Sequence, residues 1–94
     1  MPPVGFAIAG SGMIAGVHVT ALKEIPGARV VGVWSLPAED CRRFAAQHQI
    51  RGYTDYEELL GDPEVQVADI CLPSGYHAEF GIKAALAGKH VVVE

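Results

Sequence analysis

The 94-residue sequence is poor in charge and has no long apolar run. Its 7 basic and 11 acidic residues give a formal charge of −4, which excludes the basic surface used to bind nucleic acid or anionic membranes. The longest apolar runs have four to six residues, too short for a membrane-spanning helix of about 20. No positively charged segment precedes an apolar one at the N-terminus, so no secretory signal is visible.

Cysteine is scarce, since Cys41 and Cys71 are the two in the chain. They are thirty residues apart, without the spacing of a metal-binding pair, so the sequence predicts reduced, packed thiols in a cytoplasmic protein and no metal site. Apolar residues make up 50% of the chain, which excludes intrinsic disorder. The length suits one small domain.

Continuous apolar runs alternate with segments of helical period, which predicts strands buried on both faces of a parallel sheet and joined by helices. The expected strands are residues 4–9, 30–34, 52–54, 67–72 and 90–93, and the expected helices are about 14–25, 37–48, 56–60 and 78–86. Amphipathic helices turn an apolar stripe towards the core. The stripes of the first and last helix are Ile14, Val17, Ala21, Leu22, Ile25 and Ala78, Ile82, Ala85, Leu86.

Strand–helix alternation repeated in this way predicts a doubly wound, three-layer α/β fold with parallel strands in the order 3-2-1-4-5. A complete sheet of this kind has a sixth strand, which is missing here, so we expect 1–94 to be part of a larger protein. The last strand then leaves an apolar edge at Val91–Val93, which predicts self-association.

A glycine-rich turn, Gly10-Ser11-Gly12-Met13-Ile14-Ala15, joins the first strand to the first helix. In this G-x-G-x-x-A pattern the first glycine permits the tight turn, and the second lets the backbone approach a pyrophosphate. Ala15 is small enough for close packing of the helix on the strand. The turn predicts a dinucleotide site. The alternatives are a turn needed only for packing and the related glycine turn of methyltransferases, which binds a nucleoside.

A dinucleotide site usually has an acidic residue about 20 positions later, which binds the adenosine ribose. Ser35 stands there, and the nearest acids, Glu39 and Asp40, come more than a helical turn further on. Serine tolerates a 2′-phosphate that a carboxylate would repel, yet Leu36 follows where an arginine would favour that phosphate. The sequence leans slightly to NADP over NAD and does not decide between them.

The segment after the fourth strand holds Pro73, Ser74 and His77. The ends of the first and fourth strands flank the point where ligands bind in such sheets, so we expect these residues beside the cofactor. Two other residues are less certain. For His18 a packing or surface role and cofactor proximity are equally open. Asp69 lies inside a strand expected to be buried and must find a partner or face a solvated edge, because a buried unpaired charge is costly.

Four blocks of sequence, taken together, form a pattern specific enough to indicate a protein family. They are Gly10-x-Gly12-x-x-Ala15-x-x-His18, Tyr56–Leu60, Cys71-Leu72-Pro73-Ser74-Gly75-x-His77-Ala78-Glu79 and Ala87-Gly88-Lys89-His90-Val91-x-x-Glu94. In this order and spacing they resemble the N-terminal half of the Gfo/Idh/MocA family of NAD(P)-dependent oxidoreductases. The resemblance covers essentially the whole chain. It implies a Rossmann domain, followed in family members by a larger α/β domain, and oxidation of a sugar or polyol hydroxyl or the reverse reaction.

The resemblance also implies roles for individual residues. The pyrophosphate would lie on Gly10, Ser11, Gly12, Met13 and Ile14, the adenosine ribose at Ser35, and the nicotinamide near Cys71, Leu72, Pro73, Ser74 and His77. Glu94 matches the acid of the family's Glu-Lys-Pro motif, whose lysine serves in catalysis.

The printed sequence stops at Glu94, before that lysine and proline, so we expect the 94 residues alone to be inactive and assign no catalytic residue. The main hypothesis is the cofactor-binding part of an oxidoreductase. The alternative is a non-catalytic dinucleotide-sensing or scaffold module, and the lysine after Glu94 would separate the two.

Overall fold

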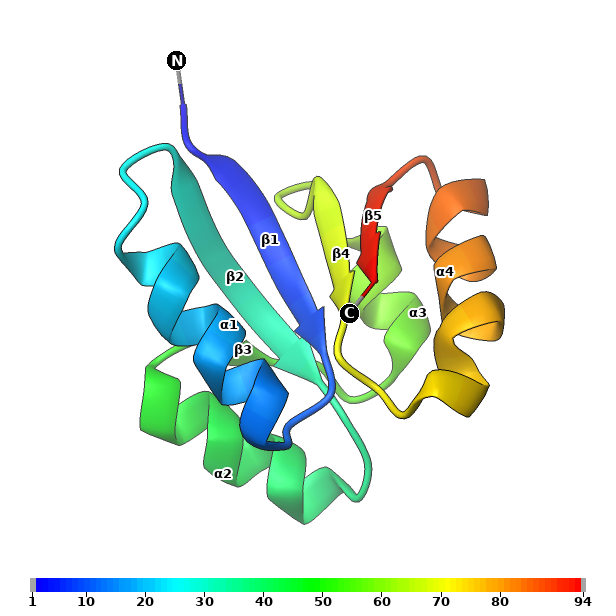
Figure 1. Cartoon of the computed structure of the whole chain (residues 1–94), viewed down its shortest axis with the longest axis horizontal. Coiled ribbons are helices and arrows are strands. Elements are labelled where there is room, and N and C mark those ends of the chain that lie inside the picture. The colour runs from blue at the N-terminus through cyan, green and yellow to red at the C-terminus, as the bar shows by residue number, and fades with distance from the viewer. Residues whose placement is uncertain (1, 94) are drawn as a thin grey trace.

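A computed structural model describes residues 2–93 as a five-stranded sheet with helices on both faces (Figure 1). The elements are β1 (Val4–Ala9), α1 (Met13–Lys23), β2 (Ala28–Trp34), α2 (Ala38–His48), β3 (Arg51–Gly52), α3 (Tyr56–Gly61), β4 (Val67–Ile70), the 3-10 turn η1 (Ser74–Tyr76), α4 (His77–Leu86) and β5 (His90–Val93). The strands are parallel in the order β3-β2-β1-β4-β5, which confirms the predicted doubly wound α/β fold.

The core consists of two apolar layers, one on each face of the sheet. On one face Ile8 and Val33 pack against Val19 of α1 and Phe44 of α2. The layer on the opposite face packs α3 and α4 against the sheet and contains Ala7, Trp34, Tyr56, Leu59, Ile70 and Ala84. Burial on both faces explains why the strands read as continuous apolar runs.

The buried faces of α1 and α4 differ from the stripes expected from the sequence. α1 buries Ala15 and Val19, and α4 buries Ala84 with Phe80 packed beside it. Leu22 alone of the predicted stripe residues is partly buried, and the large exposed ones are Ile14, Val17, Ile25, Ile82 and Leu86. The stripe assignments were therefore wrong. The small residues Ala15 and Ala84 let each helix approach the sheet closely. The spacing of the large apolar residues does not indicate this contact face.

Other sequence-based expectations hold with small shifts. The side chain of Asp55 caps α3 by accepting a hydrogen bond from the Glu58 N–H at 2.7 Å, which keeps the helix start at Tyr56 where the sequence placed it. β2 begins at Ala28 and β4 ends at Ile70, each two residues earlier than predicted. Within residues 2–93, no helix is long and apolar enough to cross a membrane, and the two cysteines form no disulfide.

A buried carboxylate ties the short strand β3 to the segment that leads into β4. Asp62 accepts hydrogen bonds from the Tyr53 hydroxyl and the Glu64 N–H, both at 2.8 Å, and pairs with Arg51. Burial alone would raise the pKa of Asp62. The hydrogen bonds from Glu64 and Tyr53, together with the charge of Arg51, outweigh burial and lower this pKa below the usual aspartate value.

We expect Asp62→Asn to lower the free energy of unfolding at pH 7 by about 1–3 kcal/mol, because hydrogen bonds to a charged acceptor are lost. A carboxyl with a lowered folded-state pKa stabilises the fold when ionised. Its contribution is present above the unfolded pKa of about 4 and is lost as the pH falls through the folded value.

Urea unfolding of both proteins at several pH values measures this difference. The difference in free energy of unfolding between the unaltered chain and Asp62→Asn should become smaller below about pH 4. Glu39→Gln is the control, since this exposed carboxylate pairs with Arg43 on the surface and its loss should change stability by about 0.5 kcal/mol or less. A difference that stays constant down to acid pH would contradict a stabilising role for the ionised Asp62 carboxylate.

Candidate functional site

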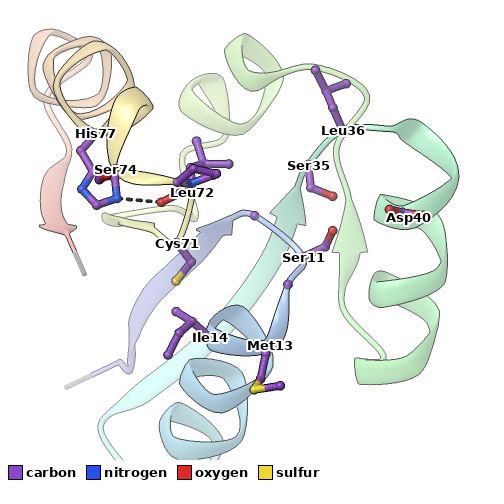
Figure 2. A pocket seen from close by; sticks show the side chains of 13 residues that line it. Ser11, Met13, Ile14, Ser35, Leu36, Asp40, Cys71, Leu72, Ser74 and His77 are labelled. Atoms are coloured by element: carbon purple, nitrogen blue, oxygen red, sulfur yellow. Dashed lines mark hydrogen bonds between the residues drawn. The ribbon is translucent and has the colours of Figure 1, made fainter.

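The carboxyl ends of β1, β2 and β4 meet at one edge of the sheet. Backbone hydrogen bonds continue past the strands, from the Gly10 N–H to the Trp34 carbonyl and from the Cys71 N–H to the Ala9 carbonyl, both at 2.8 Å. A pocket of about 560 Å³ opens there (Figure 2). Its volume lies within the ~300–1,000 Å³ typical of sites for small molecules and cofactors.

The pocket brings together eleven of the twelve residues expected at the site. They are Gly10, Ser11, Gly12, Met13, Ile14, Ser35, Cys71, Leu72, Pro73, Ser74 and His77. The twelfth, Glu94, lies outside the described residues. Leu36 and Asp40 also line the pocket and were not expected there from the sequence. Asp40 was placed too far from Ser35, because the first turn of α2 brings it back over the end of β2.

The two glycines of the turn have different structural reasons. Gly10 has a φ of +122°, and a Cβ at this position would lie 2.5 Å from the Cys71 carbonyl oxygen, so only glycine fits between β1 and β4. Gly12 has an extended backbone, with a φ of −83°, and a Cβ there would meet no atom within 4 Å. The space in front of Gly12 is therefore open to a ligand.

The N-terminus of α1 forms the floor of this open space. Gly12 is its N-cap, so no side chain caps the helix, and no acidic residue lies in its first turn. The N–H groups of a helix's first turn have no partner within the helix, and the helix dipole adds partial positive charge there. This end of α1 therefore suits a phosphate group.

Ser35 offers an unused hydrogen-bonding group at one end of the pocket. The residue is 4% exposed, and its Oγ is buried. Within residues 2–93 this oxygen alone, of the buried polar side-chain atoms, lacks a hydrogen-bond partner. Figure 2 shows the Ser35 and Ser11 hydroxyls on the same side of the pocket, with Asp40 beside them. Because a buried hydroxyl without a partner is costly, this end of the pocket suits a ligand with hydroxyl groups.

The other end of the pocket is fixed by His77, the first residue of α4. Its Nε2 lies 2.7 Å from the carbonyl oxygen of Leu72, and a carbonyl only accepts, so Nε2 carries the hydrogen and donates. This bond holds the imidazole against the segment that follows β4 (Figure 2). The ring is therefore part of the pocket wall and not a mobile surface group.

His18 does not line this pocket. Its Nδ1 lies 2.6 Å from Oδ2 of Asp69, which is 3% exposed, so the ring supplies the partner that the buried carboxylate requires. Of the two alternatives left open for His18, the structure favours packing. Of the two alternatives for Asp69, a partner or a solvated edge, the structure shows the partner.

These observations together fit a dinucleotide. A helix end that suits phosphate lies at the middle of the pocket, between a buried, unpartnered hydroxyl on one side and the Leu72–His77 wall on the other. The open space at Gly12 permits close approach of the ligand to the backbone.

Comparisons with known proteins also point to a family with a dinucleotide-binding fold. A profile named GFO_IDH_MocA, for the oxidoreductase family with an NAD-binding Rossmann fold, matches residues 4–94. The uncharacterized oxidoreductase YrbE of Bacillus subtilis is 35% identical over 88 residues, or 93% of this chain and 26% of that protein. The 4-carboxy-2-hydroxymuconate-6-semialdehyde dehydrogenase of Sphingobium is 37% identical over 89 residues, or 94% of this chain and 28% of that protein.

Solved structures are similar over the same extent. GenD2 from gentamicin A biosynthesis, in complex with NAD, has a TM-score of 0.93 and 25% identity, and the match covers 99% of this chain and 27% of that one. Biliverdin reductase from Synechocystis, in complex with biliverdin and NADP⁺, has a TM-score of 0.90 and 26% identity, with 97% and 29% covered. The chain thus spans little more than a quarter of each of these proteins.

We expect Gly12→Val to weaken dinucleotide binding at least about 100-fold and to leave the fold intact, because the branched side chain would fill the open space before α1. Isothermal titration calorimetry with NAD and NADP measures the affinity, and circular dichroism reports the fold. Gly27→Val is the matched control, since a Cβ there also meets no atom within 4 Å and Gly27 lies outside the pocket. Equal loss of affinity in both variants would contradict a role for Gly12 at the site.

Proposed function

This chain belongs to the Gfo/Idh/MocA oxidoreductase family, and on that premise we propose that its pocket binds NAD(P) as the cofactor domain of a dehydrogenase or reductase. One observation carries the proposal above the others. The glycine turn presents the uncapped N-terminus of α1 to the same pocket into which the unpartnered Ser35 hydroxyl faces. A phosphate and a sugar hydroxyl on one ligand satisfy both.

In this proposal the pyrophosphate lies on the turn from Gly10 to Ile14, and the adenosine ribose lies at Ser35. The nicotinamide lies near the residues that follow β4, which are Cys71, Leu72, Pro73 and Ser74. The hydrogen bond from His77 to the Leu72 carbonyl fixes this side of the pocket. When bound, the cofactor supplies the hydride chemistry. The residues of this chain bind and orient it.

The substrate is proposed from the family resemblance, as the hydroxyl-bearing carbon of a sugar, a polyol or a related compound. The relatives differ in substrate, since one is a semialdehyde dehydrogenase and another is a biliverdin reductase. Because this chain spans 26–29% of these relatives, we propose that a second domain supplies the substrate contacts and the catalytic group. Residues 1–94 then make up most of the Rossmann domain and are inactive alone. The cytoplasmic location stays a prediction.

The activity can be tested separately from binding. In a protein that carries this chain and a following domain, the proposal expects cofactor reduction with a sugar or polyol, lost when the lysine expected after Glu94 is changed to Ala. Cofactor binding without turnover across a panel of polyols, sugars and carbonyl compounds would instead support the non-catalytic dinucleotide-sensing module.

We expect the NAD and NADP affinities of this chain to lie within about tenfold, or ~1.4 kcal/mol, with the slight lean to NADP that Ser35 suggests. Ser35 tolerates the 2′-phosphate, whereas the Asp40 carboxylate in the same wall opposes it and no arginine adjoins Ser35. Ser35→Asp should shift the preference to NAD, and Asp40→Asn should raise the affinity for NADP alone.

Calorimetric titrations of both cofactors into the three proteins measure these affinities. Glu39→Gln is the matched control for Asp40→Asn, since Glu39 pairs with the same Arg43 but does not line the pocket. A strong preference of the unaltered chain for NAD would contradict the cofactor proposal.

We also propose self-association through the edge of the sheet. Among the strands that the structure describes, β5 pairs with β4 alone and forms an edge of the sheet, and its Val92 and Val93 are 42% and 47% exposed. An exposed apolar edge strand pairs readily with a second copy. We expect the mass from light scattering to rise with concentration, and Val92→Lys to suppress the rise. Ile82→Lys, at an exposed apolar site on α4, is the control and should not suppress it.

A further inference from the structure

Three side chains from two segments of the chain converge beside the pocket. The Nδ1 of His18, on α1, lies 2.6 Å from Oδ2 of Asp69 and 3.4 Å from Sγ of Cys71. The Cys71 sulfur also lies 3.6 Å from Oδ1 of Asp69. One imidazole nitrogen, one carboxylate oxygen and one sulfur therefore lie within 4.8 Å of one another.

The arrangement does not suit nucleophilic catalysis. In a catalytic triad the nucleophile and the carboxylate contact opposite nitrogens of the imidazole, which lets the ring accept a proton from one side while the other side is held. Here Asp69 and Cys71 both contact Nδ1 of His18. The three groups instead lie close enough together for each to offer one ligand atom to a metal ion.

The distances are close to those of a tetrahedral zinc site. Zinc binds imidazole nitrogen and carboxylate oxygen at about 2.0–2.2 Å and thiolate sulfur at about 2.3 Å, which sets its ligand atoms roughly 3.3–3.6 Å apart. The 3.4 Å from the Cys71 sulfur to Nδ1 of His18 already matches, and the 3.6 Å from this sulfur to Asp69 matches for the carboxylate oxygen Oδ1. His18 contacts the other carboxylate oxygen, Oδ2, at 2.6 Å; this contact is a hydrogen bond, and it must open by about 0.7 Å when an ion bound to Oδ2 replaces the proton.

The positions of the three groups are fixed by the fold. Asp69 and Cys71 are two residues apart on the same side of an extended segment, and the Cys71 N–H is bonded to the Ala9 carbonyl at 2.8 Å. α1 is held on the sheet by the buried Ala15 and Val19. Figure 2 shows the Cys71 sulfur on the side of the pocket near Ile14, far from Ser35 and Asp40. The cluster therefore lies apart from the end of the pocket proposed for the adenosine ribose.

Charge and burial favour a dication. The Asp69 and His18 side chains are 4% and 20% exposed, and His18 already gives the buried carboxylate a hydrogen-bond partner. A divalent ion neutralises the carboxylate and the thiolate together, and the soft sulfur selects zinc over magnesium or calcium. On binding, the thiol proton and the proton between His18 and Asp69 pass to solvent, and no electron is transferred.

We propose that His18, Asp69 and Cys71 form a three-ligand binding site for Zn²⁺, with solvent completing the tetrahedron. The sequence alone predicted no metal site. Cysteine spacing could not reveal this one, because its ligands come from two distant segments and include a single cysteine.

The test is a calorimetric titration of this chain with Zn²⁺ in two buffers of different ionisation enthalpy, in the absence of nucleotide. We expect one ion per chain and a net release of protons. Cys71→Ser and His18→Gln should each weaken binding at least about 100-fold, and Cys41→Ser, a buried cysteine outside the cluster, should leave the affinity within about twofold. Circular dichroism checks that each variant folds.

Cobalt substitution provides a readout that does not depend on the variants. Co²⁺ bound to the unaltered chain should give the near-ultraviolet thiolate-to-cobalt band and the intense visible bands of a tetrahedral site, and Zn²⁺ should remove both. Absence of zinc binding, absence of the thiolate band, or equal zinc affinity in Cys71→Ser and the unaltered chain would each overturn the proposal. The last result would assign the ion to surface groups such as His90. None of these outcomes bears on NAD(P) binding, which is measured separately.

Discussion

The close approach of β1 and β4 at Gly10 is the constraint on which the site depends. A side chain at Gly10 would collide with the Cys71 carbonyl, and the same glycine donates its N–H to the Trp34 carbonyl of β2. One residue without a side chain thus holds three strand ends together. The turn after β1, Ser35 after β2 and the segment after β4 form one pocket for that reason. A larger residue at Gly10 would separate these walls before any ligand contact was affected.

The electrostatics of the pocket follow from the same geometry. The positive end of α1 faces the open space at Gly12, and the carboxylate of Asp40 stands beside the Ser35 hydroxyl. The middle of the pocket therefore attracts phosphate, whereas the end near Ser35 disfavours a second phosphate and offers acceptors to hydroxyl groups. In the proposed site, the tolerance for NADP that Ser35 would give is balanced against repulsion from Asp40. Both cofactors occur in complexes of structural relatives.

Much of the fold and of the candidate site could be predicted from the sequence because it is local. The apolar runs, the turn from Gly10 to Ala15 and the cap at Asp55 each depend on neighbouring residues, and the strand order follows from the doubly wound fold that the strand–helix alternation predicts. The rest depends on contacts between distant segments. Asp40 lines the same pocket as Ser35, and His18 contacts Asp69 and Cys71 across more than 50 residues. No local sequence pattern indicates either of these contacts. The faces of α1 and α4 were mistaken because both helices also carry exposed apolar side chains.

The central claim is that the edge of the sheet at Gly10 binds NAD(P). Its most direct test is a titration of the ¹⁵N-labelled chain with NAD and NADP, followed by amide chemical shifts in two-dimensional NMR spectra. The structure predicts that the largest changes fall on the amides from Gly10 to Ile14, with smaller changes at Ser35 and from Leu72 to His77. Changes confined to the opposite end of the sheet, near Val4 and Gly88, or no changes at millimolar cofactor, would contradict it.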